Sequence, residues 1–402
     1  MYSELDNWIR ENWHLGIRSQ PEDEVSDREG ALLGLPYPYT VPSPGHVLCE
    51  MYYWDTYFTN LGLIAHGRMD QVENNIRNLL FMVRKYGKVL NGNMRRYLSR
   101  SQPPLLTPMV IDYRDAGGDL DLVDESLDLL IQEHDNYWEQ PPHLTQVGLN
   151  RYYDSKEEPH TEYYSPDVPG VTLTPEDMAV CESGWDMNPR TAGCGRSIIP
   201  VELNAILYRN ELSIASLLGD AGRDEDASRF TFRADERREL ILELMRGEDG
   251  YFYDWDIRTE SRISVFSAAP CSLLWAGALS QEEADELVPL LLRLETDWGI
   301  VTCLHDYGYS GMQWNWPMGW PPVQWWVVKG LLNYGYEDDA KRIARKYLEL
   351  VYRNWKDSGN LWEKYNVVDG NLDCVNDRYV MPTHMGWTAG VYAAFFQLFG
   401  ND

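Results

Sequence analysis

The chain of 402 residues has few basic residues and no long apolar run. Its 35 lysines and arginines, against 63 aspartates and glutamates, give a formal net charge of −28. Because phosphate contacts need clustered lysine and arginine, this balance argues against a nucleic-acid partner, and it equally disfavours anionic membrane surfaces. No apolar run approaches the roughly 18 residues of a membrane span, and no basic stretch followed by an apolar one marks a signal peptide. We therefore expect neither a nucleic-acid partner nor a membrane partner.

Motifs for thiol and metal chemistry are also missing. The six cysteines include no C-x-x-C pair, and the eight histidines form no H-x-x-x-H pair and no cluster with cysteine. Reduced thiols in the cytoplasm are therefore expected, with no metal site. Any chemistry must come mainly from carboxylates, arginines and aromatic side chains. The oligomeric state is not predicted.

Helical periodicity dominates the chain. Between residues 337 and 355, apolar residues recur at spacings of three and four with lysine and glutamate between them, as in an amphipathic helix. Similar patterns predict helices near residues 4–13, 70–85, 120–138, 198–218, 223–246 and 281–294. More uniformly apolar segments predict helices buried on several sides near residues 52–66, 104–115, 265–278, 322–335 and 386–399. Strand-like alternation is scarce, and residues 251–255 fit one short hairpin arm.

About twelve helices with no linker between them favour one all-α domain over residues 1–402. The architecture that suits them is an (α/α)6 barrel, two concentric rings of six helices with a funnel lined by loops at one end. Periodicity alone leaves an α-solenoid open, although no clear internal repeat is visible. Residues 139–175 are the longest non-periodic stretch. Because a long loop in a compact fold is often functional, we expect it to lie over the site.

Two acidic motifs beside tryptophan are the most informative feature: ESGWD at residues 182–186 and LWEKYN at residues 361–366. Each places a carboxylate next to a large flat ring. A ring that stacks on the C–H face of a sugar, with an acid or base at the glycosidic bond, is what a glycosidase requires. The carboxylates of Asp186 and Glu363 lie 177 positions apart (363 − 186), so only a large fold can bring them together.

Further motifs accompany these two in a fixed order. They are EMYYWDTYF at residues 50–58, NGN at 91–93, YLSRSQPP at 97–104, QWNWPMGWPP at 313–322 and GWT at 386–388. This set, in this order, resembles the trehalases of glycoside hydrolase family thirty-seven over about residues 44–398. The resemblance implies an (α/α)6 barrel that hydrolyses a small α-glucoside with inversion. It implies no metal or organic cofactor, and α,α-trehalose is the substrate expected first.

The same resemblance assigns roles to particular residues. It implies that Asp186 is the general acid and that Glu363 is the general base that activates water. Positions that hold glucose in the −1 subsite match Trp54, Asp55, Asn91, Arg100 and Gln102, and the wall of the site matches Gln313 and Trp314. Further candidates for substrate contact are Tyr52 and Trp185 within the motifs, His160 and Glu162, which stand at the family's Arg-Pro-Glu motif, and Arg378.

Physical chemistry supports these roles. An inverting hydrolase needs a protonated acid and an ionised base roughly 6.5–9.5 Å apart on opposite faces of the sugar. Desolvation by Trp185 would keep Asp186 protonated, and a neighbouring cation such as an arginine would keep Glu363 ionised. Asp55 and Arg100 would make charge-assisted hydrogen bonds to sugar hydroxyls.

The sequence departs from the family on the leaving-group side. Val47 and Leu48 stand where trehalases carry Arg-Phe, and Asn315 stands where an Asp follows the Gln-Trp pair. A glycine-rich lid with Glu-Tyr-Pro is replaced by residues 373–379, within a second lid expected near 369–385, and Arg378 stands at the family's Glu. These changes suggest a leaving group other than glucose, and Arg378 could pair with an anionic one such as glycerate.

Other interpretations stay open. Asp55 could cap a helix, Arg100 could be a structural ion-pair partner, Arg378 could pair with a surface charge, and the tryptophans could all be core. The protein could hydrolyse another α-glucoside such as glucosylglycerate, or bind sugar without catalysis. A sugar isomerase on the same barrel is disfavoured, because such enzymes use paired histidines and only His160, His305 and His384 lie in plausible loops.

Overall fold

Helices dominate the computed structural model, which describes residues 2–21, 30–45, 47–162, 170–309, 311–374 and 380–400. The α-helices of the described residues are α1 (Tyr2–Asn12), α2 (Tyr53–Ala65), α3 (Met69–Tyr86), α4 (Leu106–Asp115), α5 (Leu120–Glu133), α6 (Pro175–Glu182), α7 (Val201–Asp220), α8 (Asp224–Met245), α9 (Cys271–Ala276), α10 (Gln281–Leu291), α11 (Pro321–Asn333), α12 (Glu337–Ser358) and α13 (Trp387–Phe399). The strands are β1 (Ile17–Arg18), β2 (Tyr39–Thr40), β3 (His160–Glu162), β4 (Val171–Leu173), β5 (Ile198–Ile199), β6 (Trp255–Asp256), β7 (Ser261–Arg262), β8 (Met318–Gly319) and β9 (Tyr365–Asn366).

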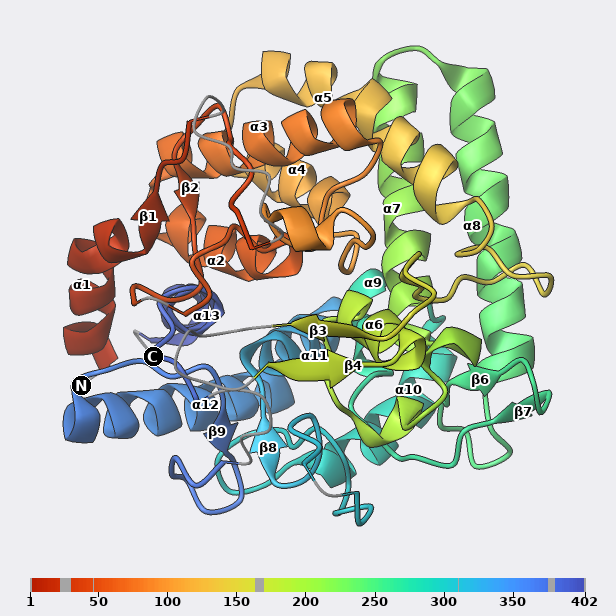
Figure 1. Ribbon diagram of the computed structural model, residues 1–402. Coiled ribbons are helices and arrows are strands. Elements are labelled where there is room, and N and C mark those ends of the chain that lie inside the picture. The colour runs from red at the N-terminus through yellow and green to blue at the C-terminus, as the bar shows by residue number, and fades with distance from the viewer. Residues whose placement is uncertain are drawn as a thin grey trace.

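Six helices form a closed inner ring. Each of α2, α4, α7, α9, α11 and α13 contacts the next, and α13 contacts α2 (Figure 1). The helices α1, α3, α5, α8, α10 and α12 alternate with them along the chain and form the outer layer, while α6 lies in a loop region. The predicted (α/α)6 barrel is confirmed.

The sequence determines which helices are inner and which are outer. Helix α13 contains no charged residue, and all of its residues from Trp387 to Phe395 are buried. Helix α12 instead carries one buried stripe, which includes Ala340, Ile343 and Tyr347, and its intervening residues are charged. A helix that is apolar all round must be surrounded by protein, whereas an amphipathic helix needs only one partner face.

Glycine lets the inner helices α2 and α13 approach closely. A Cβ atom on Gly390 would lie 1.9 Å from the carbonyl oxygen of Phe58, and one on Gly62 would lie 2.7 Å from the Cα of Gly390. Both distances are far below contact between non-bonded atoms, so no larger side chain fits there. The two backbones therefore pack directly against each other and bring the first turns of both helices together.

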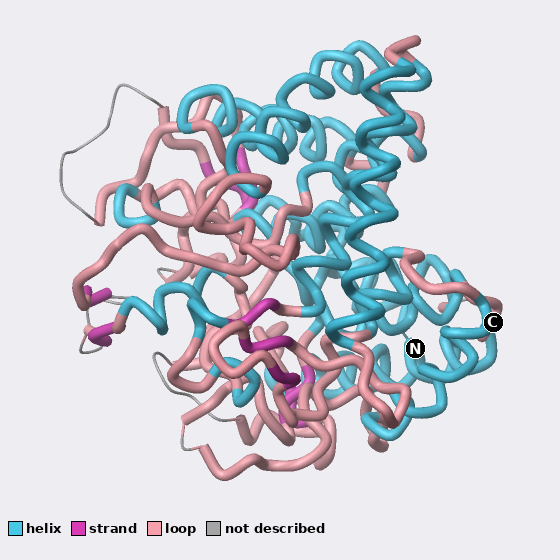
Figure 2. Tube along the Cα trace, turned by 90° about the vertical axis from the view of Figure 1, so that its right-hand side faces the viewer, coloured by secondary structure: helices cyan, strands magenta, loops and turns pink. Residues whose placement is uncertain are grey.

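Loops and short strands gather at one side of the molecule, and helices occupy the other (Figure 2). The strands pair as β1–β2, β3–β4, β5–β6–β7 and β8–β9, all antiparallel. In the last pair Gly319 lies opposite Tyr365, so the QWNWPMGWPP motif is joined to the segment that carries Glu363. The motif residues thus lie at the loop side of the barrel.

Three local expectations need adjustment. Helix α9 covers only Cys271–Ala276 of the predicted 265–278, because Ser267 pairs with Cys303 in an isolated bridge. Of residues 251–255, only Trp255 is in a strand, β6, which lies between β5 and β7. Helix α6 was not predicted: it begins at the end of the 139–175 loop, where Thr174 and Asp177 form a capping box.

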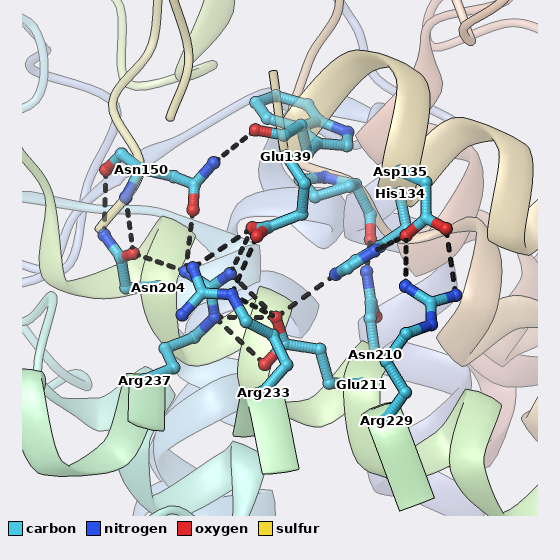
Figure 3. A network of polar contacts seen from close by, with 12 residues as sticks. His134, Asp135, Glu139, Asn150, Asn204, Asn210, Glu211, Arg229, Arg233 and Arg237 are labelled. Carbon is cyan, nitrogen blue, oxygen red and sulfur yellow. Dashed lines mark hydrogen bonds and ion pairs between the residues drawn. The ribbon is translucent and has the colours of Figure 1, made fainter. Parts of the chain in front are cut away.

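A buried arginine anchors this loop to the outer layer. Arg237 of α8 is fully buried, and its guanidinium donates to Glu211 of α7 and to Glu139 at the start of the loop (Figure 3). It also donates to Asn150 and Asn204, each at 2.8 Å. One cation therefore links α7, α8 and the loop.

Replacing Arg237 with leucine should destabilise the fold strongly. The substitution leaves Glu211 buried without its main cation, so the free energy of unfolding should fall by about 3–5 kcal/mol in urea titrations. Arg229→Leu is the matched control, because Arg229 is half exposed and its bonds go to the partly exposed Asp135. That control should lose less than about 1 kcal/mol. Equal losses in the two variants would contradict the anchoring role.

Candidate active site

A cavity lies among the loops and helix starts at the loop side of the barrel. Residues from motifs far apart in the sequence line it. Ten of the predicted residues are among them: Tyr52, Trp54, Asp55, Asn91, Arg100, Gln102, Asp186, Gln313, Trp314 and Glu363. The fold thus brings Asp186 and Glu363 into one cavity.

Sequence reasoning missed several lining residues. These are Pro42, Leu48, Tyr97, Cys181, Gly184, Trp320 and Trp387. Tyr97, Gly184, Trp320 and Trp387 belong to motifs already recognised, so the motifs were the signal that could have identified them. Leu48 is one of the departures from the family, and it now proves to line the cavity. Pro42 and Cys181 carry no such signal.

The loop that carries Asp186 is anchored through the buried carboxylate of Glu182. This carboxylate accepts backbone hydrogen bonds from Ser101 and Tyr153, both at 2.7 Å, and lies 3.0 Å from Nε2 of His143. Burial by itself raises the pKa of Glu182, but the contacts with His143 and the hydrogen bonds outweigh it and lower that pKa. An ionised Glu182 therefore fixes the start of the loop.

Gly184 then turns the loop into the cavity. Its φ of +71° is a left-handed conformation that other residues rarely adopt, and a Cβ atom there would lie 2.6 Å from the indole of Trp54. Beyond Asp186, the carbonyl of Met187 accepts a hydrogen bond from the backbone N–H of Trp314 at 3.1 Å. The Asp186 segment is thus held at both ends.

The loop that carries Glu363 is attached to the first turn of α13. Trp387 Nε1 donates to the carbonyl oxygen of Glu363 at 2.9 Å, and Thr388 Oγ1 donates to that of Trp362 at 2.6 Å. The fully buried Lys364 places its ammonium 3.2 Å from Glu363 Oε2. The expected neighbouring cation is therefore a lysine rather than an arginine.

Two amide side chains are fixed by backbone contacts. Asn91 Nδ2 donates to the carbonyls of Ser101 and Cys181 at 3.1 and 3.2 Å. Gln102 Oε1 accepts from the backbone N–H of Trp54 at 3.2 Å. Asn91 therefore offers its oxygen to a ligand, and Gln102 offers its NH₂ group.

Gln313 has its orientation fixed in the same way. Its Oε1 accepts from the Lys364 ammonium at 2.9 Å, which leaves its NH₂ group for a ligand. Its backbone oxygen accepts a hydrogen bond from Trp320 Nε1 at 3.2 Å. Lys364 thus couples the Glu363 carboxylate to the wall of the cavity.

Arg100 is held by two buried carboxylates behind the cavity. Its guanidinium donates to Glu162 at 2.7 and 3.1 Å and to Asp154 at 3.2 Å, and it lies over the ring of Tyr97. Glu162 was predicted to contact substrate but does not line the cavity, because its carboxylate binds Arg100. Among the lining residues that the structure describes, Arg100 is the only arginine or lysine.

Two other predicted contact residues also lie off the cavity. His160 is in β3, half-buried, and Trp185 is fully buried behind Trp314, 4.7 Å from it between ring centroids. The guanidinium of Arg190 also packs on Trp185, 4.8 Å from the centre of its ring. Arg378 lies outside the described residues, as does the rest of 375–379 in the second expected lid.

Tryptophans form one wall of the cavity. Trp314 and Trp320 stack at 4.0 Å with an angle of 3° between their planes. Trp54 lies 5.6 Å from Trp314, and Trp387 meets both Trp54 and Trp320 edge-on. Such a wall presents a broad, rigid apolar face to a ligand.

Asp55, in the first turn of α2, is a carboxylate of the cavity without a neighbouring cation in the described part of the chain. It is buried, and no arginine or lysine among the described residues lies within 4.0 Å of it. Burial raises the pKa of Asp55 to about 8. At neutral pH this group is therefore a carboxylic acid.

A cluster away from the cavity offers ligand atoms for a metal. His134, Glu139 and Glu211 place one ligand atom each within 4.8 Å of one another. The guanidinium of Arg237 already donates to both carboxylates and balances their charge. The cluster therefore fits a structural network better than an ion site.

The sequence matches the family model of the trehalases from residue 2 to residue 400. The chain belongs to the trehalase family. It is therefore a glycoside hydrolase with a small carbohydrate as its substrate. Among the described residues, no helix of this trehalase-family chain has both the length and the apolarity to cross a membrane.

Solved structures resemble this trehalase-family member over most of its length. Neutral trehalase Nth1 from Saccharomyces cerevisiae is 26% identical with a TM-score of 0.79, over 91% of this chain and 77% of that one. The mannosylglycerate hydrolase of Thermus thermophilus in complex with glucose is 17% identical with a TM-score of 0.65, over 89% and 95%. A rhamnosidase from Klebsiella oxytoca with rhamnose bound is 12% identical with a TM-score of 0.60, over 90% and 60%. The last two show the fold alone.

A methyl group at Gly184 should damage the site. Gly184→Ala should lower the free energy of unfolding by more than about 2 kcal/mol and reduce hydrolytic activity at least about tenfold, since strain at positive φ adds to the collision with Trp54. Gly193→Ala is the matched control: its φ is +72°, but nothing lies within 4 Å of the added methyl. The control should cost about 1 kcal/mol and leave activity unchanged. Similar activity in both variants would argue against a tightly held loop.

Asp55→Asn should stabilise the protein at neutral pH. The pKa of Asp55 is about 8 in the folded protein, against an ordinary 3.8, so the folded state holds this proton more tightly than the unfolded state does. The resulting contribution to the free energy of unfolding is complete below about pH 4 and is lost as the pH rises toward 8. At pH 7 the uncharged amide should therefore raise the free energy of unfolding by about 2–4 kcal/mol relative to Asp55, with no gain at pH 4. Urea titrations at the two pH values measure this. A gain that does not depend on pH would show that Asp55 is not the titrating group.

Proposed function

We propose that the protein is an inverting hydrolase of an α-glucoside, with Asp186 as general acid and Glu363 as general base. The observation that carries this proposal is that both carboxylates, 177 positions apart, line one cavity together with the tryptophan wall. An inverting mechanism requires an acid at the leaving oxygen and a base that activates water on the opposite face of the sugar.

The surroundings of the two carboxylates suit different roles. Glu363 has the Lys364 ammonium 3.2 Å from its Oε2, so a cation stands beside the candidate base. Asp186 is partly buried in a loop whose neighbours, Trp185 and Trp314, are aromatic. General acid and general base need different surroundings, and the two segments differ: a cation stands beside Glu363, and tryptophans pack around the loop of Asp186.

The cavity supports binding of one hexose ring in a defined orientation. The tryptophan wall suits stacking on its C–H face, and Asn91, Gln102 and Gln313 offer one acceptor and two NH₂ donors. Arg100 adds a charged donor. We therefore propose glucose in this subsite, and α,α-trehalose, the substrate named by the family, as the first substrate to test.

A different leaving group is the second candidate. Leu48 lines the cavity where the family carries the Phe of its Arg-Phe pair, and Arg100 is the only arginine or lysine among its described lining residues. A lining that differs from the family's on this side suits a leaving group other than a second glucose. A related α-glucoside such as glucosylglycerate is the alternative that follows, with Arg378 as the candidate contact.

One assay tests both candidates. The protein is incubated with trehalose, glucosylglycerate, glucosylglycerol, kojibiose and sucrose, and the anomeric protons are followed by NMR. We expect β-glucose to appear first from one substrate, which identifies the leaving group and establishes inversion. First appearance of α-glucose would refute the mechanism, and no release from any substrate would favour a sugar-binding protein.

Isosteric substitutions test the two roles. Asp186→Asn and Glu363→Gln should each lower kcat by about 10²–10⁴-fold, because each removes one proton-transfer group while preserving shape. Glu158→Gln, at an exposed glutamate of the 139–175 loop, is the control and should retain full activity. Retention of more than about a tenth of kcat in either active-site variant would contradict its assignment.

A further inference from the structure

His384 is a buried histidine next to the cavity with no hydrogen bond to either ring nitrogen among the described residues. It lies three residues before α13 and stacks on Trp387, 4.6 Å away with an angle of 18°. Buried polar groups are almost always hydrogen-bonded, so two unbonded nitrogens on one ring call for an explanation. A carboxylate oxygen, Oδ1 of Asp55, lies 3.5 Å from Nε2.

His66, another buried histidine, has a hydrogen-bond partner at each ring nitrogen. Trp13 Nε1 donates to Nδ1 of His66 at 2.9 Å, so the proton of His66 is on Nε2, which lies 2.9 Å from Asp6 Oδ1. In that pair the histidine donates and the carboxylate accepts. His384 has no donor at Nδ1, so nothing fixes its proton on Nε2.

The pair formed by Asp55 and His384 has a different proton balance. Burial raises the pKa of Asp55 to about 8 and lowers the pKa of His384 to about 3, so both groups are neutral near pH 7. A protonated Asp55 needs an acceptor for its O–H group. Among the described residues, the only basic nitrogen within 4.0 Å of its carboxyl group is Nε2 of His384.

One other charged group acts on this ring. Glu363 raises the pKa of His384 by its negative charge, although burial dominates. Its own charge is compensated by Lys364. A neutral ring whose Nε2 accepts a hydrogen bond carries its own proton on Nδ1.

We propose that His384 is a positioning residue whose Nε2 accepts a hydrogen bond from the Oδ1–H group of Asp55. This bond holds the Asp55 proton on Oδ1 and leaves Oδ2 as an acceptor for one hydroxyl of the bound sugar. The hydroxyl-binding step rests on the proposed function. The contact between Asp55 and His384 is a property of the free protein and can be tested without a substrate.

The first experiment locates the proton by ¹⁵N NMR of the histidine ring in the free protein. The His384 signals are assigned by their loss in His384→Phe. Between about pH 5 and pH 7, the range between the two pKa values, we expect a neutral ring with its proton on Nδ1. Asp55→Asn should keep this tautomer, since the new amide N–H can donate to Nε2, and Asp55→Leu should alter it. A proton on Nε2, or a charged ring, would overturn the proposal.

The second experiment measures KM and kcat for the substrate found in the panel. His384→Phe keeps an aromatic ring on Trp387 but cannot accept a hydrogen bond, so KM should rise about tenfold with kcat changed less than about threefold. His384→Gln can accept through its amide oxygen and should keep KM within about threefold of the unsubstituted protein. His66→Gln, at a buried histidine that does not line the cavity, is the control and should leave KM and kcat unchanged.

The outcomes separate this proposal from the proposed function. An unchanged KM in His384→Phe, or a KM in His384→Gln as high as in His384→Phe, would reduce His384 to a packing residue and overturn the proposal. If the unsubstituted protein hydrolyses no α-glucoside, the proposed function fails, and the NMR measurement still decides the contact between Asp55 and His384. If His384→Phe does not fold, the loss of the same signals in His384→Gln supplies the assignment.

Discussion

The contact of α2 and α13 at Gly62 and Gly390 determines where the active-site loops can lie. Because the two backbones touch, the first turns of both helices meet at the cavity, and Trp54 lies 5.7 Å from Trp387. Trp387 in turn holds the carbonyl of Glu363. Gly390, which allows the inner ring to close, therefore also helps to position the segment that carries Glu363, the candidate base. Any residue larger than glycine at position 390 would separate the helices and move both walls of the cavity.

Buried charge is the second constraint on this acidic chain. With only 35 basic residues against 63 acidic ones, most cations could have remained at the surface, yet Arg100, Arg190, Arg237 and Lys364 are almost completely buried. Each lies against one or two buried carboxylates, because an uncompensated charge in the interior costs several kcal/mol. Asp55 avoids that cost in another way: it keeps its proton, for which a neutral histidine is a suitable partner.

The sequence predicted the barrel well because helical periodicity is a local property. The segments near residues 337–355 and 386–399 show from their own pattern that one is amphipathic and the other buried, and the structure agrees. Ten residues chosen from the motifs also line one cavity. What could not be predicted depends on contacts between distant segments: Glu162 and Trp185 act behind the cavity, and Lys364 rather than an arginine accompanies Glu363. His384 shows the same limit, since nothing in its local sequence points to Asp55, 329 positions away (384 − 55).

Selectivity for a sugar follows from how the polar lining residues use their hydrogen bonds. Asn91 has both its N–H groups occupied by backbone carbonyls, so it presents an acceptor, while Gln102 and Gln313 have their oxygens occupied and present donors. None of the three can rotate its amide to suit a different ligand without breaking a buried bond. A site with polarity fixed in this way rejects a sugar whose hydroxyl is missing or inverted far more strongly than an apolar wall could, because a buried donor or acceptor would be left unpaired. Under the proposed function, the side of the cavity lined by these three amides is therefore the one that selects the sugar ring.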